Sequence, residues 1–371
     1  MPNESVEKLV VPGVRGLMPY QPGKPVAELQ RELGLERVIK LASNENPLGP
    51  GSNALEIIRS ELDELARYPD GSGFQLKQAL AEKLAVKVDQ ITLGNGSNDI
   101  LELVARTFLM PGREAVFSRH CFAIYPIVTQ AVGAVSRVAP TLTENYGHDL
   151  VAMAGLVGEK TSVVFLANPN NPTGTFLNSE TLRWFISSLP SHVVVVVDEA
   201  YFEYVEEEDY PDCLQWLETF PRLIVTRTFS KAYGLAGLRV GYSVCSAEIA
   251  EMLNRVRQPF NVNSLALSAA EAALSDQQHL DHSKQVNRAG LGQLANGFDR
   301  LEREYIPSAG NFICVNVGRD AESVYSGLLE KGVIVRPVAN YDMPEHLRVT
   351  VGRADENAIF LHALEHVLAH V

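Results

Sequence analysis

The sequence predicts a two-part α/β protein, with a large unit built on a mainly parallel sheet flanked by helices and a smaller α+β unit after it. Three observations lead to this fold class. The chain has 371 residues, of which 46% are hydrophobic, and this exceeds what one average domain needs for its core. Short β-rich runs alternate with helical patterns between residues 92 and 244. A second group of strand-like runs follows a long helical stretch near the C-terminus.

The alternating runs identify the strands of the larger sheet. Each run is short and rich in apolar residues, as expected for strands that helices cover on both faces. The predicted strands are AVFS (115–118), AVSRVA (134–139), SVVFLA (162–167), HVVVVVDEA (192–200), RLIVT (222–226) and LRVGYSV (238–244). Helical patterns such as SNDILELVARTFL (97–109) lie between them.

The two ends of the chain have different patterns. VPGVRGLMPYQPGKP (11–25) is rich in Pro and Gly and predicts an irregular arm over another surface. A long helical pattern with a Gly-rich interruption covers 263–304, and the strand candidates FICVNV (312–317), VIVRPV (333–338) and HLRVTVG (346–352) and a helix from about Glu356 follow. We predict an N-terminal arm over 1–40 that is part of the small domain, a large domain over 41–270 and a small α+β domain over 271–371.

Composition and charge exclude several classes of function. The formal net charge of −13 repels nucleic acid and anionic membranes, so we expect small-molecule partners, with neither nucleic acid nor a membrane among them. The four cysteines have no paired spacing, which argues against a disulfide framework or a zinc site. The N-terminus does not resemble a secretory signal and no long apolar run is present, so we expect a cytoplasmic protein.

Polar motifs follow the predicted buried strands, where parallel α/β sheets collect their ligands. They are GNGSND (94–99), ANPNNPTG (167–174), DEAY (198–201) and TFSK (228–231). Two of them are ambiguous when taken singly. GNGSND lacks the third glycine of a dinucleotide fingerprint and is also typical of a plain turn. Asp198 is compatible with a helix cap or a magnesium ligand, although no phosphate-binding G-x-x-x-x-G-K-[ST] loop accompanies it.

Together the motifs predict a ligand with a phosphate, an aldehyde and a basic ring nitrogen. The helix start at Ser97 and Asn98, the hydroxyls of Thr228 and Ser230 and the guanidinium of Arg239 suit the phosphate. Lys231 would condense with the aldehyde, and a buried Asp198 would stabilise a protonated ring nitrogen. Asn171 and Tyr201 could hydrogen-bond a phenolic oxygen. These features describe pyridoxal phosphate.

Lys231 must lose its proton to act as a nucleophile. Desolvation beside a second cation, for which Arg239 is the candidate, lowers the pKa of a lysine. The alternative is a surface lysine whose stem covers apolar neighbours. The preceding strand and the small residues Ala232, Gly234, Ala236 and Gly237 favour the nucleophile, because they leave room for a bulky ligand.

In this order the motifs resemble those of the pyridoxal-phosphate aminotransferases with the aspartate-aminotransferase fold, which is fold type I of the pyridoxal-phosphate-dependent transferases. TFSKAYGLAG is similar to the lysine signature of that family, and NPNNPTG and DEAY are similar to its ring-binding segments. The resemblance covers nearly the whole chain. The segments MPYQPGKP (18–25), LASNENPLGP (41–50), RYPDGSG (67–73), GNGSND and VRPVANYDMPEHLRVTVG (335–352) resemble, more narrowly, the histidinol-phosphate aminotransferases.

The resemblance implies a role for each matched residue. Lys231 would bind the cofactor covalently and move the proton, and Asp198 would pair with the ring nitrogen. Asn171 and Tyr201 would contact the ring oxygen, and Phe122 would stack on the ring where many relatives have tyrosine. The phosphate would be held by Ser97, Asn98, Thr228, Ser230 and Arg239. Tyr68 would reach the phosphate bound in the other subunit of a homodimer with shared active sites. Tyr20 and Arg336 would hold the substrate phosphate, although a surface ion pair is an alternative role for Arg336. Arg348 would either hold the carboxylate of glutamate or 2-oxoglutarate or serve as a contact for both substrates. Asn44 with Asn46 would line the substrate pocket.

Several alternatives remain open at this stage. The resemblance implies transamination between histidinol phosphate and 2-oxoglutarate, but an aromatic amino-acid aminotransferase and a phosphothreonine decarboxylase use the same scaffold. A regulator or binding module without chemistry is the alternative from another class, and the presence of Lys231, Asp198 and Arg239 argues against it. His362, His366 and His370 recur every four residues, yet a half-exposed helix stripe explains them without a metal.

Overall fold

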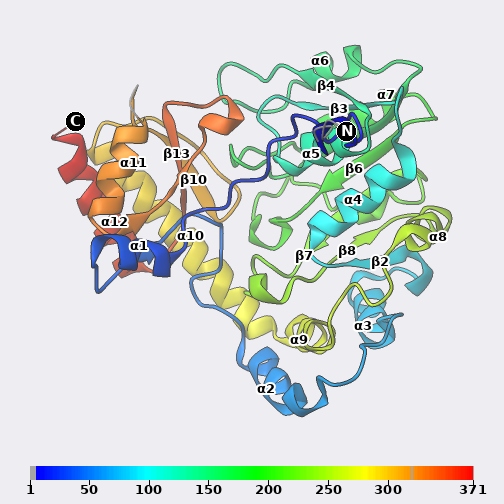
Figure 1. Ribbon diagram of the computed structural model, residues 1–371, viewed down its shortest axis with the longest axis horizontal. Helices are drawn as coiled ribbons and strands as arrows, with labels where there is room; N and C mark the ends of the chain where they lie inside the picture. The colour runs from blue at the N-terminus through cyan, green and yellow to red at the C-terminus, as the bar shows by residue number, and fades with distance from the viewer. Residues whose placement is uncertain (1–5, 319–320, 371) are drawn as a thin grey trace, which may run out of the picture.

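The computed structural model describes residues 6–318 and 321–370. Figure 1 shows two groups of elements, a larger one around β2 to β8 and a smaller one around β10 and β13. Short 3₁₀ helices occur along the chain at Val6–Lys8, Leu62–Glu64, Val88–Gln90, Phe202–Tyr204, Cys213–Trp216, Ala236–Leu238 and Ala339–Tyr341.

The larger group contains a seven-stranded sheet in the order β2-β8-β7-β6-β5-β3-β4. Its strands are β2 (Ile91–Gly94), β3 (Glu114–Ser118), β4 (Val135–Ala139), β5 (Thr161–Ala167), β6 (Val194–Asp198), β7 (Leu223–Thr228) and β8 (Gly241–Val244). Only β8 runs antiparallel to its neighbours in this sheet, so the predicted mainly parallel sheet is confirmed.

Helices cover both faces of this sheet. They are α2 (Ser52–Glu61), α3 (Phe74–Leu84), α4 (Ser97–Phe108), α5 (Ile124–Ala131), α6 (Leu150–Gly155), α7 (Ser179–Ser188), α8 (Ala247–Val256) and α9 (Ser264–Ser275). The valine run of β6 supplies both cores, because side chains of a strand alternate between the faces. Val195 and Val197 join one hydrophobic cluster, and Val194 and Val196 join the other.

The smaller group contains an antiparallel sheet in the order β12-β13-β10-β9. Its elements are α10 (Gln277–Arg300), β9 (Tyr305–Ile306), β10 (Phe312–Asn316), α11 (Ala321–Glu330), β12 (Arg336–Pro337), β13 (His346–Thr350) and α12 (Ala354–Leu368). One predicted strand is divided here. The run 333–338 splits into β11 (Val333–Ile334), which pairs with β1 (Ile39–Lys40), and β12, which pairs with β13.

The predicted Gly-rich interruption of the helical stretch is wrong. The helices α9 and α10 separate at Asp276, and the glycines lie inside α10. A Cβ atom at Gly290 would lie 2.3 Å from Val351, and one at Gly297 would lie 2.4 Å from Leu361. These glycines therefore allow close packing rather than a break, which offsets the cost of glycine in a helix.

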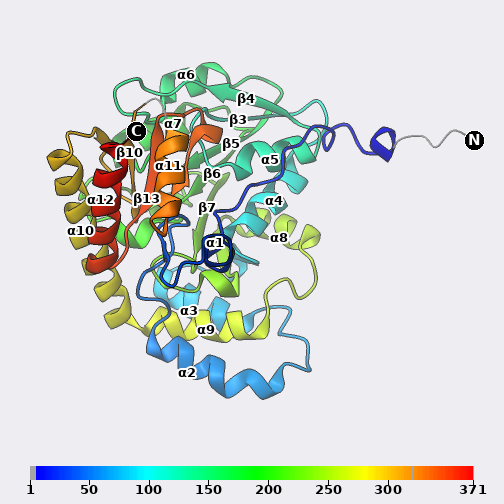
Figure 2. The same cartoon turned by 60° about the vertical axis from the view of Figure 1, so that its left-hand side comes forward.

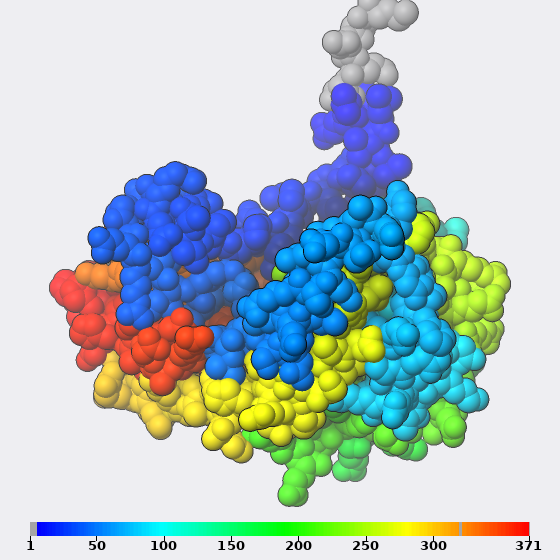
Figure 3. All heavy atoms as spheres, turned by 90° about the horizontal axis from the view of Figure 1, so that it is seen from below, coloured from blue at the N-terminus to red at the C-terminus, as the bar shows by residue number. Residues whose placement is uncertain are grey.

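The N-terminal segment reaches both groups of elements. Residues after the 3₁₀ helix Val6–Lys8 cross the molecule past α5, as Figure 2 shows, and then form α1 (Val26–Leu33) and β1 beside the smaller sheet. Leu29 of α1 packs with Ala42 and Ile334. Figure 3 shows α2 lying along α9 on the adjoining face. The first five residues of the predicted arm lie outside the described residues, and the domain boundaries at 40 and 270 stay a prediction.

Candidate active site

One cavity lies at the carboxyl ends of β5, β6 and β7 and brings together every predicted site residue except Tyr68, Arg336 and Asn46. Its lining consists of Tyr20, Ser43, Asn44, Ser97, Asn98, Phe122, Ile124, Ala167, Pro169, Asn171, Asp198, Ala200, Tyr201, Thr228, Ser230, Lys231, Arg239 and Arg348. The lining comes from segments far apart in the sequence, and they meet because parallel strands end at the same edge of a sheet.

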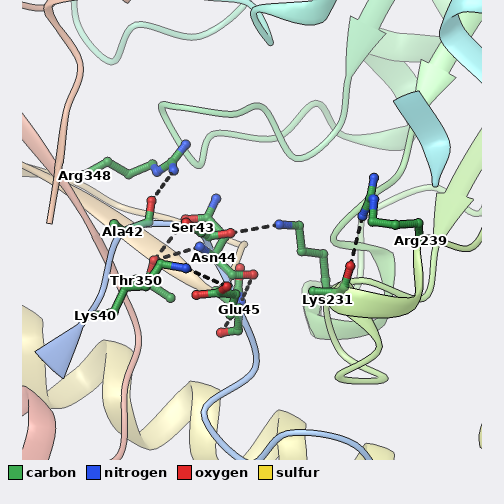
Figure 4. A network of polar contacts seen from close by, with 11 residues as sticks. Lys40, Ala42, Ser43, Asn44, Glu45, Lys231, Arg239, Arg348 and Thr350 are labelled. Atoms are coloured by element: carbon green, nitrogen blue, oxygen red, sulfur yellow. Dashed lines mark hydrogen bonds and ion pairs between the residues drawn. The ribbon is translucent and has the colours of Figure 1, made fainter. Parts of the chain in front are cut away.

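Lys231 lies in the turn after β7 and points across the cavity. Its Nζ donates a hydrogen bond to the carbonyl oxygen of Ser43 over 3.1 Å, as Figure 4 shows. Burial lowers the pKa of Lys231 to about 7, and the nearby Arg348 cation lowers it further than Arg239 does. The sequence had pointed to Arg239 as the second cation. Arg348 therefore replaces it as the larger electrostatic influence.

Asp198 is the last residue of β6 and its carboxylate is buried. Thr226 donates a hydrogen bond to Oδ1 over 2.9 Å, and Tyr125 donates one to Oδ2 over 3.1 Å. Burial raises the pKa of Asp198 to about 6, and the two hydrogen bonds oppose that rise because they stabilise the charged form. The carboxylate is thus ionised at neutral pH.

Glu199, the next residue, belongs to a different environment. Its carboxylate binds Arg227 through Nη2 at 2.7 Å, and Arg227 also pairs with Asp212 at 2.8 Å. Asp198 instead bonds Thr226, the neighbour of Arg227 in β7, so the two acidic residues have separate partners. The two carboxylates therefore lie in separate hydrogen-bonding environments.

The opposite end of the cavity is suited to an anion. Helix α4 begins at Ser97. Its N-cap residue is Gly96, which has no side chain to bond the first backbone N–H groups, so these groups remain available at the positive end of the helix. A Cβ atom at Gly96 would lie 2.3 Å from Nη2 of Arg239, and one at Gly241 would lie 2.5 Å from the backbone nitrogen of Ser97. Both glycines therefore allow the helix start, the strand and Arg239 to come together.

Arg239 and the hydroxyls complete this anion site. Nη1 of Arg239 donates to Oγ of Ser230 over 3.2 Å and to the carbonyl oxygen of Ala236 over 3.1 Å. Thr228 accepts a hydrogen bond from the backbone nitrogen of Ser230 over 3.1 Å, which orders the turn that carries Lys231. A helix start, two hydroxyls and a guanidinium fit a phosphate group.

A third set of polar residues lies between the two sheets. Nη1 of Arg348 donates to Oδ1 of Asn171 over 2.5 Å, and Nη2 donates to the carbonyl oxygen of Ala42 over 2.8 Å. Nδ2 of Asn44 donates to the hydroxyl of Tyr201 over 2.9 Å. Burial raises the pKa of Tyr201 to about 12, so its hydroxyl keeps its proton at neutral pH.

Three further aromatic residues were predicted at the site, namely Phe122, Tyr20 and Tyr68. Phe122 lines the cavity and meets Tyr125 edge to face, with the ring centroids 5.9 Å apart. Tyr20 lines it too, and the Arg336 guanidinium lies 5.7 Å from the Tyr20 ring centroid, just outside the lining. Tyr68 lies away from the cavity, is 83% exposed and stacks on Phe260.

Asn46 does not line the cavity. Its Nδ2 donates to the carbonyl oxygen of Ala232 and to Oγ of Ser283, each over 2.8 Å. It ties the N-terminal segment to the lysine turn and to α10, which is a structural role.

The sequence did not single out three neighbours of the site. They are Ser43, which contributes a backbone carbonyl, and Tyr125 and Thr226, which hold Asp198. Thr226 could have been found, because it precedes Thr228 by two residues and faces the same side of β7. The sequence carries no comparable signal for Tyr125 or for a backbone oxygen.

Within residues 6–318 and 321–370, no group of three or more His, Cys, Asp or Glu side chains is arranged to hold a metal ion. His366 and His370 stack on each other with ring centroids 4.5 Å apart. Nor does any helix in the described part of the chain have the length and apolar character to span a membrane.

The cavity thus combines an amine of lowered pKa, an ionised buried carboxylate and an anion site. A cofactor with an aldehyde, a basic ring nitrogen and a phosphate fits these groups. The uncapped helix start supplies backbone donors for the phosphate, and the absence of a side chain at Gly96 leaves the Arg239 guanidinium room beside that helix start.

Known proteins with similar sequences belong to an aminotransferase family. The sequence model of the family described as aminotransferase class I and II matches residues 36–364. The chain is 60% identical over 363 residues to histidinol-phosphate aminotransferase 2 of a Pseudomonas fluorescens strain, with 97% of this chain and 98% of that protein covered. It is 58% identical over 368 residues to histidinol-phosphate aminotransferase 2 of Methylococcus capsulatus, with 98% and 99% covered.

Solved structures agree with this. Histidinol-phosphate aminotransferase from Sinorhizobium meliloti, in complex with pyridoxal-5'-phosphate, superposes with a TM-score of 0.89 at 28% identity and covers 97% of this chain and 98% of its own. A mutant of Thermus thermophilus aspartate aminotransferase reaches 0.83 at 21% identity, with 99% of this chain and all of its own covered, and shows the shared fold. The predicted fold type I is therefore confirmed, and the chain belongs to the histidinol-phosphate aminotransferases within the class I and II aminotransferases.

Proposed function

We propose that the chain catalyses the reversible transamination of histidinol phosphate with 2-oxoglutarate, giving imidazole-acetol phosphate and glutamate, as a step of histidine biosynthesis with pyridoxal phosphate as cofactor. One observation carries the proposal. The amine of Lys231, the carboxylate of Asp198 and the guanidinium of Arg239 line a single cavity. The names of the relatives support the choice of substrate.

When bound, pyridoxal phosphate supplies an aldehyde for the substrate amine and a protonated ring that accepts electrons from the substrate carbon. Lys231, with a pKa of about 7, is largely neutral above neutral pH and would supply the nucleophilic amine for the aldehyde and the base that moves the proton. Thr226 and Tyr125 stabilise the ionised form of Asp198, which would keep the ring nitrogen protonated.

The other lining residues position the cofactor. In this proposal Arg239, Ser230, Thr228 and the α4 start at Ser97 and Asn98 hold the phosphate. Phe122 stacks on the ring, and Asn171 and Tyr201 donate to its oxygen. The positive helix end and the guanidinium favour the charged phosphate, which matters in a protein with a net charge of −13.

Two arginines and two uncharged residues would recognise the substrates. Arg348 is buried and its Nε has no hydrogen-bond partner among the described residues, so it retains a donor for the carboxylate of glutamate or 2-oxoglutarate. Arg336 lies beside Tyr20, which lines the cavity, and this pair would hold the phosphate of histidinol phosphate. Asn44 lines the same cavity near both cofactor and substrate.

A substrate panel tests the proposal. We expect kcat/KM for histidinol phosphate to exceed the values for phenylalanine and phosphothreonine. Arg336→Ala should lower the value for histidinol phosphate by about tenfold or more and leave the value for phenylalanine, which has no phosphate, unchanged. Arg37→Ala, an exposed arginine paired with Asp355, is the control. A dominant phenylalanine value would show an aromatic amino-acid aminotransferase, and decarboxylation of phosphothreonine would show the third activity.

The proposed assembly is a homodimer with shared active sites. Tyr68 is exposed and lies outside the cavity of its own chain, and Leu62 and Leu65 of the same stretch of sequence are exposed too. If Tyr68 completes the partner's site, mixing Lys231→Ala and Tyr68→Ala subunits by joint refolding restores about a quarter of the wild-type activity, because half the dimers carry one complete site. No gain over the separate variants would refute the shared site.

A further inference from the structure

We propose that Asn44 is a positioning residue that fixes the direction of the Tyr201 hydrogen bond, so that the Tyr201 hydroxyl donates to the ring oxygen of the cofactor. The inference rests on the proposed cofactor and gives Asn44 a task besides contact with substrate. Asn44 is 1% exposed, and its backbone N–H, its backbone carbonyl oxygen, Oδ1 and Nδ2 each have a hydrogen-bond partner.

The direction of each hydrogen bond between Thr350, Asn44 and Tyr201 follows from which groups can donate. The backbone N–H of Asn44 donates to Oγ1 of Thr350 over 2.9 Å, and an N–H group has no other option. The Thr350 hydroxyl then uses its own hydrogen toward Oδ1 of Asn44, at 3.2 Å, as Figure 4 shows for these two residues. With its oxygen occupied in this way, the Asn44 amide presents Nδ2, which only donates, to the Tyr201 hydroxyl at 2.9 Å.

Tyr201 is therefore an acceptor on the side of Asn44. This is the only hydrogen bond of the Tyr201 hydroxyl among residues 6–318 and 321–370, so its own hydrogen remains for an acceptor in the cavity that Tyr201 lines. Lys231, whose Nζ lies 5.8 Å from the ring centroid, Arg348 and Asp198 are the charged groups near Tyr201. Arg348 and the protonated form of Lys231 accept no hydrogen bond, and Nζ of Lys231 is bonded to the carbonyl oxygen of Ser43. Asp198 is already bonded to Thr226 and Tyr125.

The backbone at Asn44 is built for this arrangement. Its φ of 54° lies in the left-handed region, which asparagine tolerates better than most residues with a side chain. Nδ2 of Asn311 also donates to the carbonyl oxygen of Asn44 over 3.0 Å and holds the peptide in place. The amide is thus held from β13, through Thr350, and from the segment before β10, through Asn311.

The predicted chemical effect has a definite sign. A hydrogen bond from Tyr201 stabilises negative charge on the cofactor oxygen, so it lowers the pH at which the visible absorbance of the bound cofactor titrates. Removing the Asn44 amide frees the Tyr201 hydroxyl to turn and weakens this donation. The titration then moves to higher pH.

The experiment is a pH titration of the visible absorbance of cofactor-loaded protein. Asn44→Gly keeps the left-handed backbone accessible and removes the amide, and we expect a rise of about 0.5–1 pH unit. Asn44→Asp keeps the shape but replaces the donor with an acceptor that draws the Tyr201 hydrogen to itself, so a larger rise is expected. Tyr201→Phe raises the value as well, and adding Asn44→Gly to it produces no further change.

The control is Asn46→Ala, which removes a buried amide two residues away with no contact to Tyr201. It should lower the melting temperature and leave the titration unchanged. An unshifted Asn44→Gly or Asn44→Asp protein, or a shift that persists in full in the Tyr201→Phe background, would overturn the role of Asn44. Wild-type protein that takes up no cofactor would refute the proposed function itself, so the two failures are distinguishable.

Discussion

The hydroxyl of Tyr125 donates a hydrogen bond to Oδ2 of Asp198 over 3.1 Å, and both side chains are shielded from solvent. The Tyr125 ring is held by Phe165, on which it stacks with centroids 5.0 Å apart, and it meets Phe122 edge to face. A single side chain thus supports the carboxylate proposed for the ring nitrogen and the ring proposed to stack on the cofactor.

Tyr125→Phe should weaken cofactor binding in a pH-dependent way. Loss of the donor raises the pKa of Asp198 above its present value of about 6, because the charged form loses a hydrogen bond. Only the ionised form of Asp198 pairs with the protonated ring nitrogen, and this form is lost as the pH falls through the pKa of Asp198. If that pKa rises by one unit, the apparent Kd for pyridoxal phosphate becomes about fivefold larger at pH 6 and stays nearly unchanged at pH 8. Equilibrium titration of the protein with cofactor measures both values.

Tyr233→Phe is the matched control for this change. Tyr233 is buried and packs on Phe229, but it does not bond Asp198. An equal loss of affinity in Tyr233→Phe, or a loss in Tyr125→Phe that does not depend on pH, would contradict the explanation.

Gly96→Ala should damage the phosphate site. The new Cβ would meet Arg239, so the guanidinium must move from the start of α4, and we expect the Kd for pyridoxal phosphate to rise about tenfold or more. Gly112→Ala shares the strain of a positive φ, with 88° against 79°, but its Cβ would meet nothing within 4 Å. Both variants should lose about 1 kcal/mol of stability, and only Gly96→Ala should lose affinity. Equal affinities would show that Arg239 tolerates the methyl group.

Reconstitution of cofactor-free protein should follow the titration of Lys231. The neutral amine is the nucleophile, so the rate of covalent capture should fall about tenfold from pH 8 to pH 6 with a midpoint at about 7. Stopped-flow absorbance at several pH values gives this profile. Lys231→Ala should show no visible band, whereas Lys77→Ala, in which another lysine of lowered pKa is removed, should behave like wild type. A midpoint near the ordinary lysine value would contradict the assigned environment.

Sequence patterns predicted the residues at strand ends well, because parallel strands place their carboxyl ends at one edge. Asp198 and the TFSK turn follow from this rule alone, as does the helix start at Ser97. Interactions between segments far apart in the sequence could not be predicted from the sequence patterns. Nothing in the pattern places Arg348 beside Lys231, since Arg348 belongs to a strand of the other sheet.

The errors have a related cause. Gly290 and Gly297 look like helix breakers locally, but contacts with Val351 and Leu361 require small residues within a continuous helix. The run 333–338 looks like one strand, but it changes partners between Ile334 and Arg336. In both cases packing against a distant segment overrides the local preference.

The most direct test of the proposed function is a half-reaction on purified, cofactor-loaded protein mixed with histidinol phosphate and no 2-oxoglutarate. The predicted result is loss of the visible cofactor band with release of about one imidazole-acetol phosphate per active site, and recovery of the band when 2-oxoglutarate is added. A band that persists with histidinol phosphate but disappears with phenylalanine would contradict the proposed substrate. Continuous turnover without any acceptor would contradict transamination.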